Sequence, residues 1–248
     1  GWRLEGSGLG GPLVAQDVAV LPDGRLCITR AFDKQARRPS IDQCLIVKPA
    51  PPSKERGSAE ASAEAPLSPL SFGPYGTTGG WGQLSQPRCC CGCGSEVFVA
   101  DAGLHRVAVY ESTTGKAVRA IGGQGAAPGL FRAPFGVAVA EGCLVVSESA
   151  GKRVQVLTLH GVPLQVVHSL GGLRGVSWDG HSGLLAAAGF DDQCVVLLRG
   201  DASKLRRLSL KPGSGEEIRP QRVVPSGAAV APRRCYKYVC VGPKSVFQ

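Results

Sequence analysis

Short apolar segments separated by turns rich in Gly and Pro recur along this chain, and apolar and polar positions alternate within many of them. Residues 94–110 and 142–157 repeat one order: an apolar strand, an acidic turn that contains Gly, and a strand that begins with Arg. Alternation with a period of two favours β-strands, and each segment reads as an antiparallel hairpin. No helical periodicity separates these segments. The hydrophobic pattern therefore predicts an all-β fold.

Strands of similar composition precede the hairpins at Asp17, Gly136, Gly175 and Gly227. A spacing of roughly 40 to 50 residues is typical of β-propeller blades, each made of four antiparallel strands. We count five blades, and six if the chain is a fragment. The last blade, predicted at 228–231, 236–241 and 245–248, lacks one strand. The segment Trp2–Glu5 would supply it, so we expect N- and C-terminal strands to close the ring and remove its exposed edges.

The repeat resembles the NHL-repeat family of β-propellers. Residues 129–139, which read GLFRAPFGVAV, match the opening of that repeat, and Asp101 with the segment 106–110 matches its hairpin. Leu104 and Gly151 stand where the family commonly has Asn. The Cys-rich segment 88–93 also replaces the usual inner strand of the second unit, which leaves that strand open to doubt. The resemblance implies a propeller of NHL type.

We expect residues 1–248 to form a single domain. A flexible insertion at about 49–69 is predicted, because this stretch is rich in Pro, Ala, Ser and Glu and has little to bury. The sequence shows neither a membrane span nor a signal peptide. Five of the ten cysteines lie inside apolar runs and favour core packing, so we expect a reducing, cytoplasmic location.

The chain has a formal net charge of +9, which favours acidic partners or phosphates. Loops that emerge on one face of such a propeller carry most of the candidate binding residues. These are Arg37, Arg38, Arg88, His105, Arg106, Arg132, Lys152, Arg153 and Arg174. The resemblance implies that this face takes a peptide or single-stranded RNA. In the alternative interpretation Arg106 and Arg153 brace the repeat, and Phe131 and Phe135 pack between blades.

The sequence offers three further candidate sites, one for a nucleotide and two for a metal ion, and each also has a structural explanation. The segment 6–11 fits a dinucleotide-binding glycine pattern, but Pro12 and a strand follow it where a helix is needed. Adjacent cysteines at 89, 90, 91 and 93 cannot easily converge on one zinc ion. The four histidines, at 105, 160, 168 and 181, form no metal-binding pattern. We therefore expect no cofactor.

The sequence favours a non-catalytic interaction module with a protein, peptide or RNA partner and no membrane contact. In NHL proteins such a propeller is often the target-recognition part of a ubiquitin ligase, so the resemblance implies a place in a larger protein of that kind. The alternative is a metal-dependent lyase or hydrolase with its site in the central channel.

Overall fold

A computed structural model describes residues 15–30, 44–48, 69–168, 171–199, 204–209, 222–225, 238–242 and 245–246 of the chain. The predicted closing strand Trp2–Glu5, the insertion up to residue 68, and both Arg37 and Arg38 lie outside these residues. The closure of the ring by the termini and the flexibility of the insertion therefore stay predictions.

The described strands form four sheets of four strands and a last sheet of three, all antiparallel. Blade 1 consists of β1 (Ala15–Val20), β2 (Leu26–Arg30), β3 (Cys44–Val47) and β4 (Leu70–Phe72). Blade 2 consists of β5 (Pro87–Cys93), β6 (Glu96–Asp101), β7 (Arg106–Glu111) and β8 (Ala117–Ile121). Blade 3 consists of β9 (Pro134–Ala140), β10 (Cys143–Glu148), β11 (Arg153–Thr158) and β12 (Pro163–His168). Blade 4 consists of β13 (Leu173–Asp179), β14 (Leu184–Gly189), β15 (Cys194–Arg199) and β16 (Lys204–Ser209), and blade 5 of β17 (Arg222–Pro225), β18 (Tyr238–Gly242) and β19 (Ser245–Val246).

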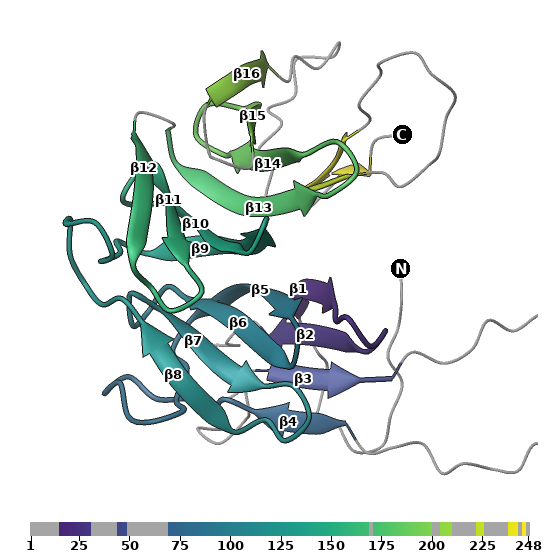
Figure 1. Cartoon of the computed structure of the whole chain (residues 1–248), viewed down its shortest axis with the longest axis vertical. Helices are drawn as coiled ribbons and strands as arrows, with labels where there is room; N and C mark the ends of the chain where they lie inside the picture. Colours follow the sequence, from purple (N-terminus) through teal and green to yellow (C-terminus); the bar gives the residue numbers. More distant parts are fainter. Residues whose placement is uncertain are drawn as a thin grey trace, which may run out of the picture.

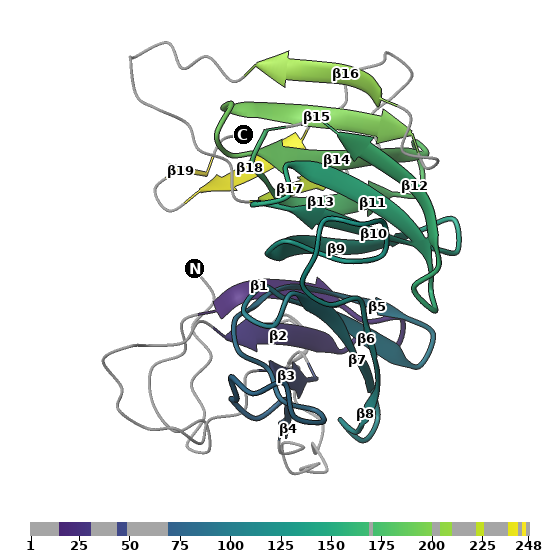
Figure 2. The ribbon, with the colours of Figure 1, turned by 90° about the vertical axis from the view of Figure 1, so that its left-hand side faces the viewer.

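The first strand of each blade is its inner strand, and the inner strands β1, β5, β9, β13 and β17 contact one another in chain order. The sheets consequently follow one another like the blades of a propeller (Figures 1 and 2). This arrangement confirms the predicted all-β propeller. No helix long and apolar enough to cross a membrane occurs in the described part of the chain.

The start of the inner strand is irregular at the same place in blades 1 to 4. The pairing register shifts between Ala15 and Asp17, and between Pro87 and Cys90. Equivalent shifts occur at Pro134 in blade 3 and after Leu173 in blade 4. Each shift is a β-bulge, in which one strand has an extra residue that re-aims its side chain. The extra residue belongs to the sequence-level repeat, and it matters for the site described below.

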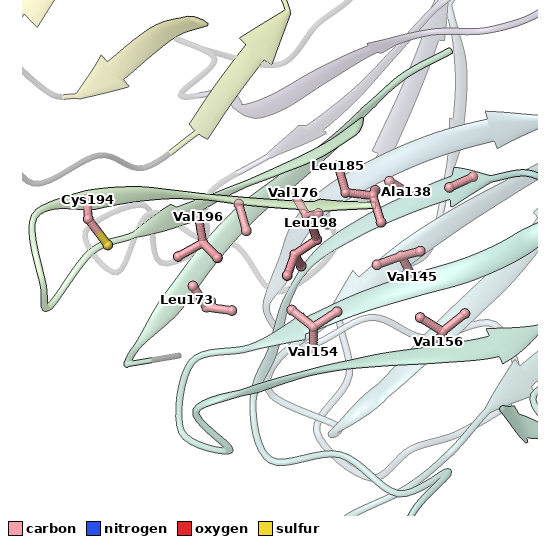
Figure 3. Close-up of a cluster of buried hydrophobic side chains, with 12 residues drawn as sticks. Ala138, Val145, Val154, Val156, Leu173, Val176, Leu185, Cys194, Val196 and Leu198 are labelled. Atoms are coloured by element: carbon pink, nitrogen blue, oxygen red, sulfur yellow. The ribbon is translucent and has the colours of Figure 1, made fainter. Parts of the chain in front are cut away.

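Apolar side chains from successive blades meet face to face. Between blades 3 and 4, Val145, Val154 and Val156 lie opposite side chains of the next blade (Figure 3). Those partners include Val176, Leu185, Val196 and Leu198. Because alternate residues of a strand point to opposite faces, each blade contributes one apolar face to the core before it and one to the core after it. Inter-blade packing is therefore the main hydrophobic contribution to the fold.

Two sequence predictions need comment. The Cys-rich segment does form an inner strand, β5, which pairs with β6 over almost its whole length. In the described part of the chain, the first strand of the last blade is β17 at Arg222–Pro225, and the strand predicted at 228–231 lies outside the described residues.

Leu185 offers a direct test of the inter-blade core, because its side chain is 0% exposed. We expect Leu185→Ala to lower the free energy of unfolding by about 2–5 kcal/mol, through lost burial and a residual cavity. Urea denaturation followed by circular dichroism measures this. The matched control is Leu164→Ala, where the side chain is 56% exposed, and this change should have a negligible effect. Equal effects of the two substitutions would contradict the packing described here.

Candidate functional site

Seven of the nine predicted binding residues lie in the described part of the chain, and the strand register places them at one edge of the blades. Pro87 pairs with Asp101, which in turn pairs with Arg106. In blade 3, Pro134 pairs with Glu148, which pairs with Arg153. The start of the inner strand, the end of the second and the start of the third therefore coincide. We call this the entry edge, and it carries Arg88, His105, Arg106, Arg132, Lys152, Arg153 and Arg174.

Arg153 holds the loop that leads into blade 3. The residue is 4% exposed, and its Nε atom donates to Glu148 Oε1 at 2.6 Å. The Nη2 atom donates to the carbonyl of Leu130 at 2.7 Å, and Nη1 donates to the carbonyl of Ala126. Glu148, which is fully buried, also accepts from the backbone N–H of Arg132 at 2.7 Å. This buried ion pair ties the incoming loop to the blade.

Arg106 makes the equivalent contacts in blade 2. Its Nη2 atom donates to the carbonyl of Gln83 at 2.8 Å, and Nη1 donates to that of Gly79 at 3.3 Å. Asp101 accepts from the backbone N–H of Gln86 at 2.9 Å. Burial raises the pKa of Asp101, while this N–H, that of Ser85 and the positive charge of Arg106 act in the opposite direction. Arg106 and Arg153 therefore have a structural role, as the alternative interpretation expected.

His105 and Lys152 occupy the same position in successive turns, with left-handed φ angles of 53° and 51°. The Nδ1 atom of His105 accepts from the backbone N–H of Ala133 at 3.0 Å, so this side chain links blade 2 to blade 3. Lys152 is exposed. Arg132 is exposed as well, and its carbonyl accepts from Gly151 N at 3.2 Å, which keeps the backbones around these two cations together.

The extra residues of the bulges form a row across the blades. Arg88 and Arg174 stand on either side of Phe135, with guanidinium carbons 5.5 and 4.9 Å from the ring centroid. Arg174 also lies 3.5 Å from the centroid of the Phe190 ring. Arg88 donates to Gln16 Oε1, at the equivalent bulge of blade 1, at 3.4 Å. Stacking of guanidinium groups on aromatic faces holds the row in place.

The sequence predicted Arg88 and Arg174 but missed Gln16 and Phe190, and it treated Phe135 only as a packing residue. Phe131 is fully buried, as expected, whereas Phe135 is half-buried. The signal that could have found the row is positional. Each member of the row on an inner strand directly follows the first residue of that strand, so one column of the repeat holds them all.

The cysteines of β5 point alternately to two different cores. Cys90 packs with Cys27 and Cys44 between blades 1 and 2, while Cys89 packs on the other face of the strand. Burial raises the pKa of the Cys89 thiol to about 12 and also raises the pKa of the Cys91 thiol. The hydrogen bond with Cys27, together with burial, raises the pKa of the Cys90 thiol. In the residues that the structure describes, no three His, Cys, Asp or Glu side chains are grouped to hold a metal ion.

None of the four histidines lies on an inner strand. His105 links two blades, and His160 and His181 lie in turns. His168 ends the outer strand β12. The histidines therefore do not converge on the central channel, where the enzyme alternative would need them.

No protein-family model matches the sequence, and no curated protein matches it either. Solved structures do resemble it. A catalytically inactive variant of virginiamycin B lyase from Staphylococcus aureus, with quinupristin, gives a TM-score of 0.56 at 10% identity over 86% of this chain and 60% of that one. A protein of unknown function from Bacteroides caccae gives 0.55 at 16% identity over 91% of this chain and 70% of that one. U3-55K gives 0.55 at 13% identity over 82% of this chain and 54% of that one.

These likenesses show the propeller fold alone, because all three identities are low. The chain spans less than two thirds of the length of both the lyase and U3-55K.

We call the contacts of Arg106 and Arg153 with the loops that enter their blades the arginine clamp. The clamp can be tested by removing the Arg153 side chain. We expect Arg153→Ala to destabilise the protein by about 3–5 kcal/mol, because the buried Glu148 carboxylate loses its charged partner. Chemical denaturation measures the change. The neighbouring Lys152→Ala is the matched control and should be nearly neutral, since that side chain is exposed. A similarly small effect at Arg153 would show that the ion pair does not hold the loop.

Proposed function

We propose that this chain is a non-catalytic propeller module that binds an anionic partner, a peptide or protein segment or single-stranded RNA, at its entry edge. The observation that carries the proposal is the row of Arg88, Phe135 and Arg174, flanked by the exposed Arg132 and Lys152. Cations concentrated on one edge attract anionic partners over distances up to the screening length.

Arg88 is positioned for such a partner. Its described hydrogen-bond acceptors are the side-chain oxygens of Gln16 at 3.4 Å and Gln86 at 3.3 Å, and both are neutral. Its Nε atom is buried and has no hydrogen-bond partner within the described structure. A guanidinium group offers five N–H donors in a planar fork that suits carboxylates and phosphates. The Phe135 ring, 5.5 Å from the guanidinium carbon, adds a cation–π contact.

Arg132 and Lys152 add positive charge to the entry edge, and their side chains hold no part of the described structure together. Neither side chain makes a hydrogen bond or an ion pair with the described residues, although the backbone of each is held in place. This separates them from Arg106 and Arg153, whose guanidinium groups are engaged by loop carbonyls. We expect the partner to contact Arg132, Lys152 and Arg88, while Arg106 and Arg153 hold the loops of the same edge.

The repeated acid and Arg pairs, Asp101 with Arg106 and Glu148 with Arg153, support an assignment to the NHL type. That type supports in turn a role as the target-recognition part of a larger, ubiquitin-ligase-like protein. We prefer binding to the metal-dependent enzyme because the histidines lie at turns and at the end of an outer strand.

Charge reversal tests the proposal. We expect Arg132→Glu combined with Lys152→Glu to weaken binding of a fluorescent acidic peptide or a single-stranded RNA at least about tenfold at low salt, and to reduce the slope of binding against salt concentration. Fluorescence anisotropy measures the affinity with each probe separately. The probe that responds identifies the class of partner.

The matched control is Lys116→Glu, which makes the same kind of change in an exposed residue at the opposite edge of blade 2. Thermal unfolding should be unchanged in both variants. The proposal would be refuted if the wild type bound neither probe. It would also be refuted if the double variant bound a probe with the same affinity as the wild type.

A further inference from the structure

The turn between β14 and β15 in blade 4 has the same shape as the entry-edge turns of blades 2 and 3, but it lacks the arginine clamp. Gly189 pairs with Cys194 across this turn, at the positions where the other two blades have an acidic residue and the clamp Arg. Gln193, the last residue of the turn, has a φ angle of 49°, close to the angles of His105 and Lys152. The blade 4 turn can therefore be compared with the other two position by position.

Two aspartates lie against the loop that enters blade 4. Phe190 N donates to Gly172 O at 3.0 Å, so the turn and this loop are in contact. Asp191 and Asp192 follow Phe190, and both are exposed. A Cβ atom at Gly172 would collide with the Asp191 carboxylate, and one at Gly171 would collide with the Asp192 carboxylate. Both carboxylates therefore lie at the entry edge, over a pair of glycines.

This acidic turn adjoins the row of Arg88, Phe135 and Arg174. Phe190 opens the turn, and the centroid of its ring lies 3.5 Å from the guanidinium carbon of Arg174. The same guanidinium carbon lies 4.9 Å from the centroid of the Phe135 ring. Arg174 therefore joins the cationic part of the row to the turn that carries the two carboxylates.

The entry edge thus changes sign from one blade to the next. Arg88 lies in blade 2, and the exposed Arg132 and Lys152 lie at the start of blade 3 and in its turn. Asp191 and Asp192 lie in blade 4. A polyanion that followed the row would place its phosphates beside these two carboxylates, and like charges in contact select against a partner. The charge pattern therefore favours a partner that carries both signs.

We propose that the entry edge takes a peptide segment of mixed charge, with acidic side chains over blades 2 and 3 and a Lys or Arg side chain at Asp191 and Asp192. This inference rests on the proposed function, and it selects a peptide over single-stranded RNA. The two carboxylates accept from the ammonium or guanidinium group of the segment, while Arg132 and Lys152 pair with its acidic side chains. Asp191 and Asp192 thereby set the direction in which the segment lies.

The test compares two kinds of fluorescent peptide by anisotropy. The mixed peptide has a run of Glu, a short Gly-Ser spacer and a pair of Lys, and it is made in both sequence orders. The control peptide has Gln in place of each Lys, so it is more anionic. Attraction to a chain of net charge +9 would by itself make the control bind more tightly. We expect the opposite: one order of the mixed peptide should bind about three- to fivefold more tightly than its control, as an exposed ion pair allows.

Matched variants locate the preference. Asp191→Asn combined with Asp192→Asn removes both carboxylates with little change of shape, so it should abolish the preference for the mixed peptide. Glu111→Gln combined with Glu141→Gln removes the same charge from the opposite edge and should leave the preference unchanged. Binding of single-stranded RNA should increase more in the Asn variant than in this control, because only the Asn variant loses the local repulsion. If the Asn variant does not fold, the comparison of peptides on the wild type still decides the question.

Equal or tighter binding of the control peptide by the wild type would overturn the proposal, because the two carboxylates would then contribute nothing to recognition. A preference that persists in the Asn variant would place the basic side chain of the partner elsewhere, and it would overturn the proposal too. Tighter binding of RNA than of either peptide would overturn the choice of a peptide. Failure of the proposed function itself is detected separately, by the charge reversal at Arg132 and Lys152, because that change affects every acidic probe and not the preference for Lys.

Discussion

The arginine clamp at the entry edge is the interaction on which the rest of the described structure depends. Arg106 and Arg153 each donate to carbonyls of the loop that enters their own blade. Those loops connect one blade to the next, so the clamp fixes where each inner strand begins. An acidic side chain at the end of the second strand binds the backbone N–H groups that follow the loop. A cation and an anion from one blade thus hold the two halves of a single connection.

The position of the inner strand then decides what the entry edge displays. In blades 2 and 3 the clamp fixes the start of the inner strand, and the bulge falls there at the same place as in blades 1 and 4. Arg88, Phe135 and Arg174 come from three different blades, yet the guanidinium carbons of Arg88 and Arg174 lie 5.5 and 4.9 Å from the centroid of the Phe135 ring. The row is therefore a product of the repeat and the clamp together, since neither a lone blade nor an unfixed loop would align these side chains.

The sequence predicted well the pairing of strands that are adjacent in the chain. The alternating valines of β7 and β11, the apolar run of β10 and the Arg after each turn predicted the hairpins of blades 2 and 3. It was a poorer guide where side chains from different blades meet. The contacts of Arg88 and Arg174 with Phe135 need three blades to come together, and no periodicity in the sequence records this.

The difference between blades 2 and 3 shows how a repeat changes its polar contacts without changing its fold. Glu148 is one methylene longer than Asp101, and it reaches both Arg153 Nε and Gln155 Nε2. The shorter Asp101 accepts from the backbone N–H groups of Ser85 and Gln86, and Ala108 replaces the glutamine. Blade 2 holds the same loop with other groups, because Arg106 donates to Gln83 O and the hydroxyl of Tyr110 donates to Gly82 O. Blade 3 has Leu157 at the position of Tyr110, so a small and a large side chain in blade 2 replace Gln155 and Leu157, and the hydroxyl of Tyr110 contacts the loop in place of the Gln155 amide.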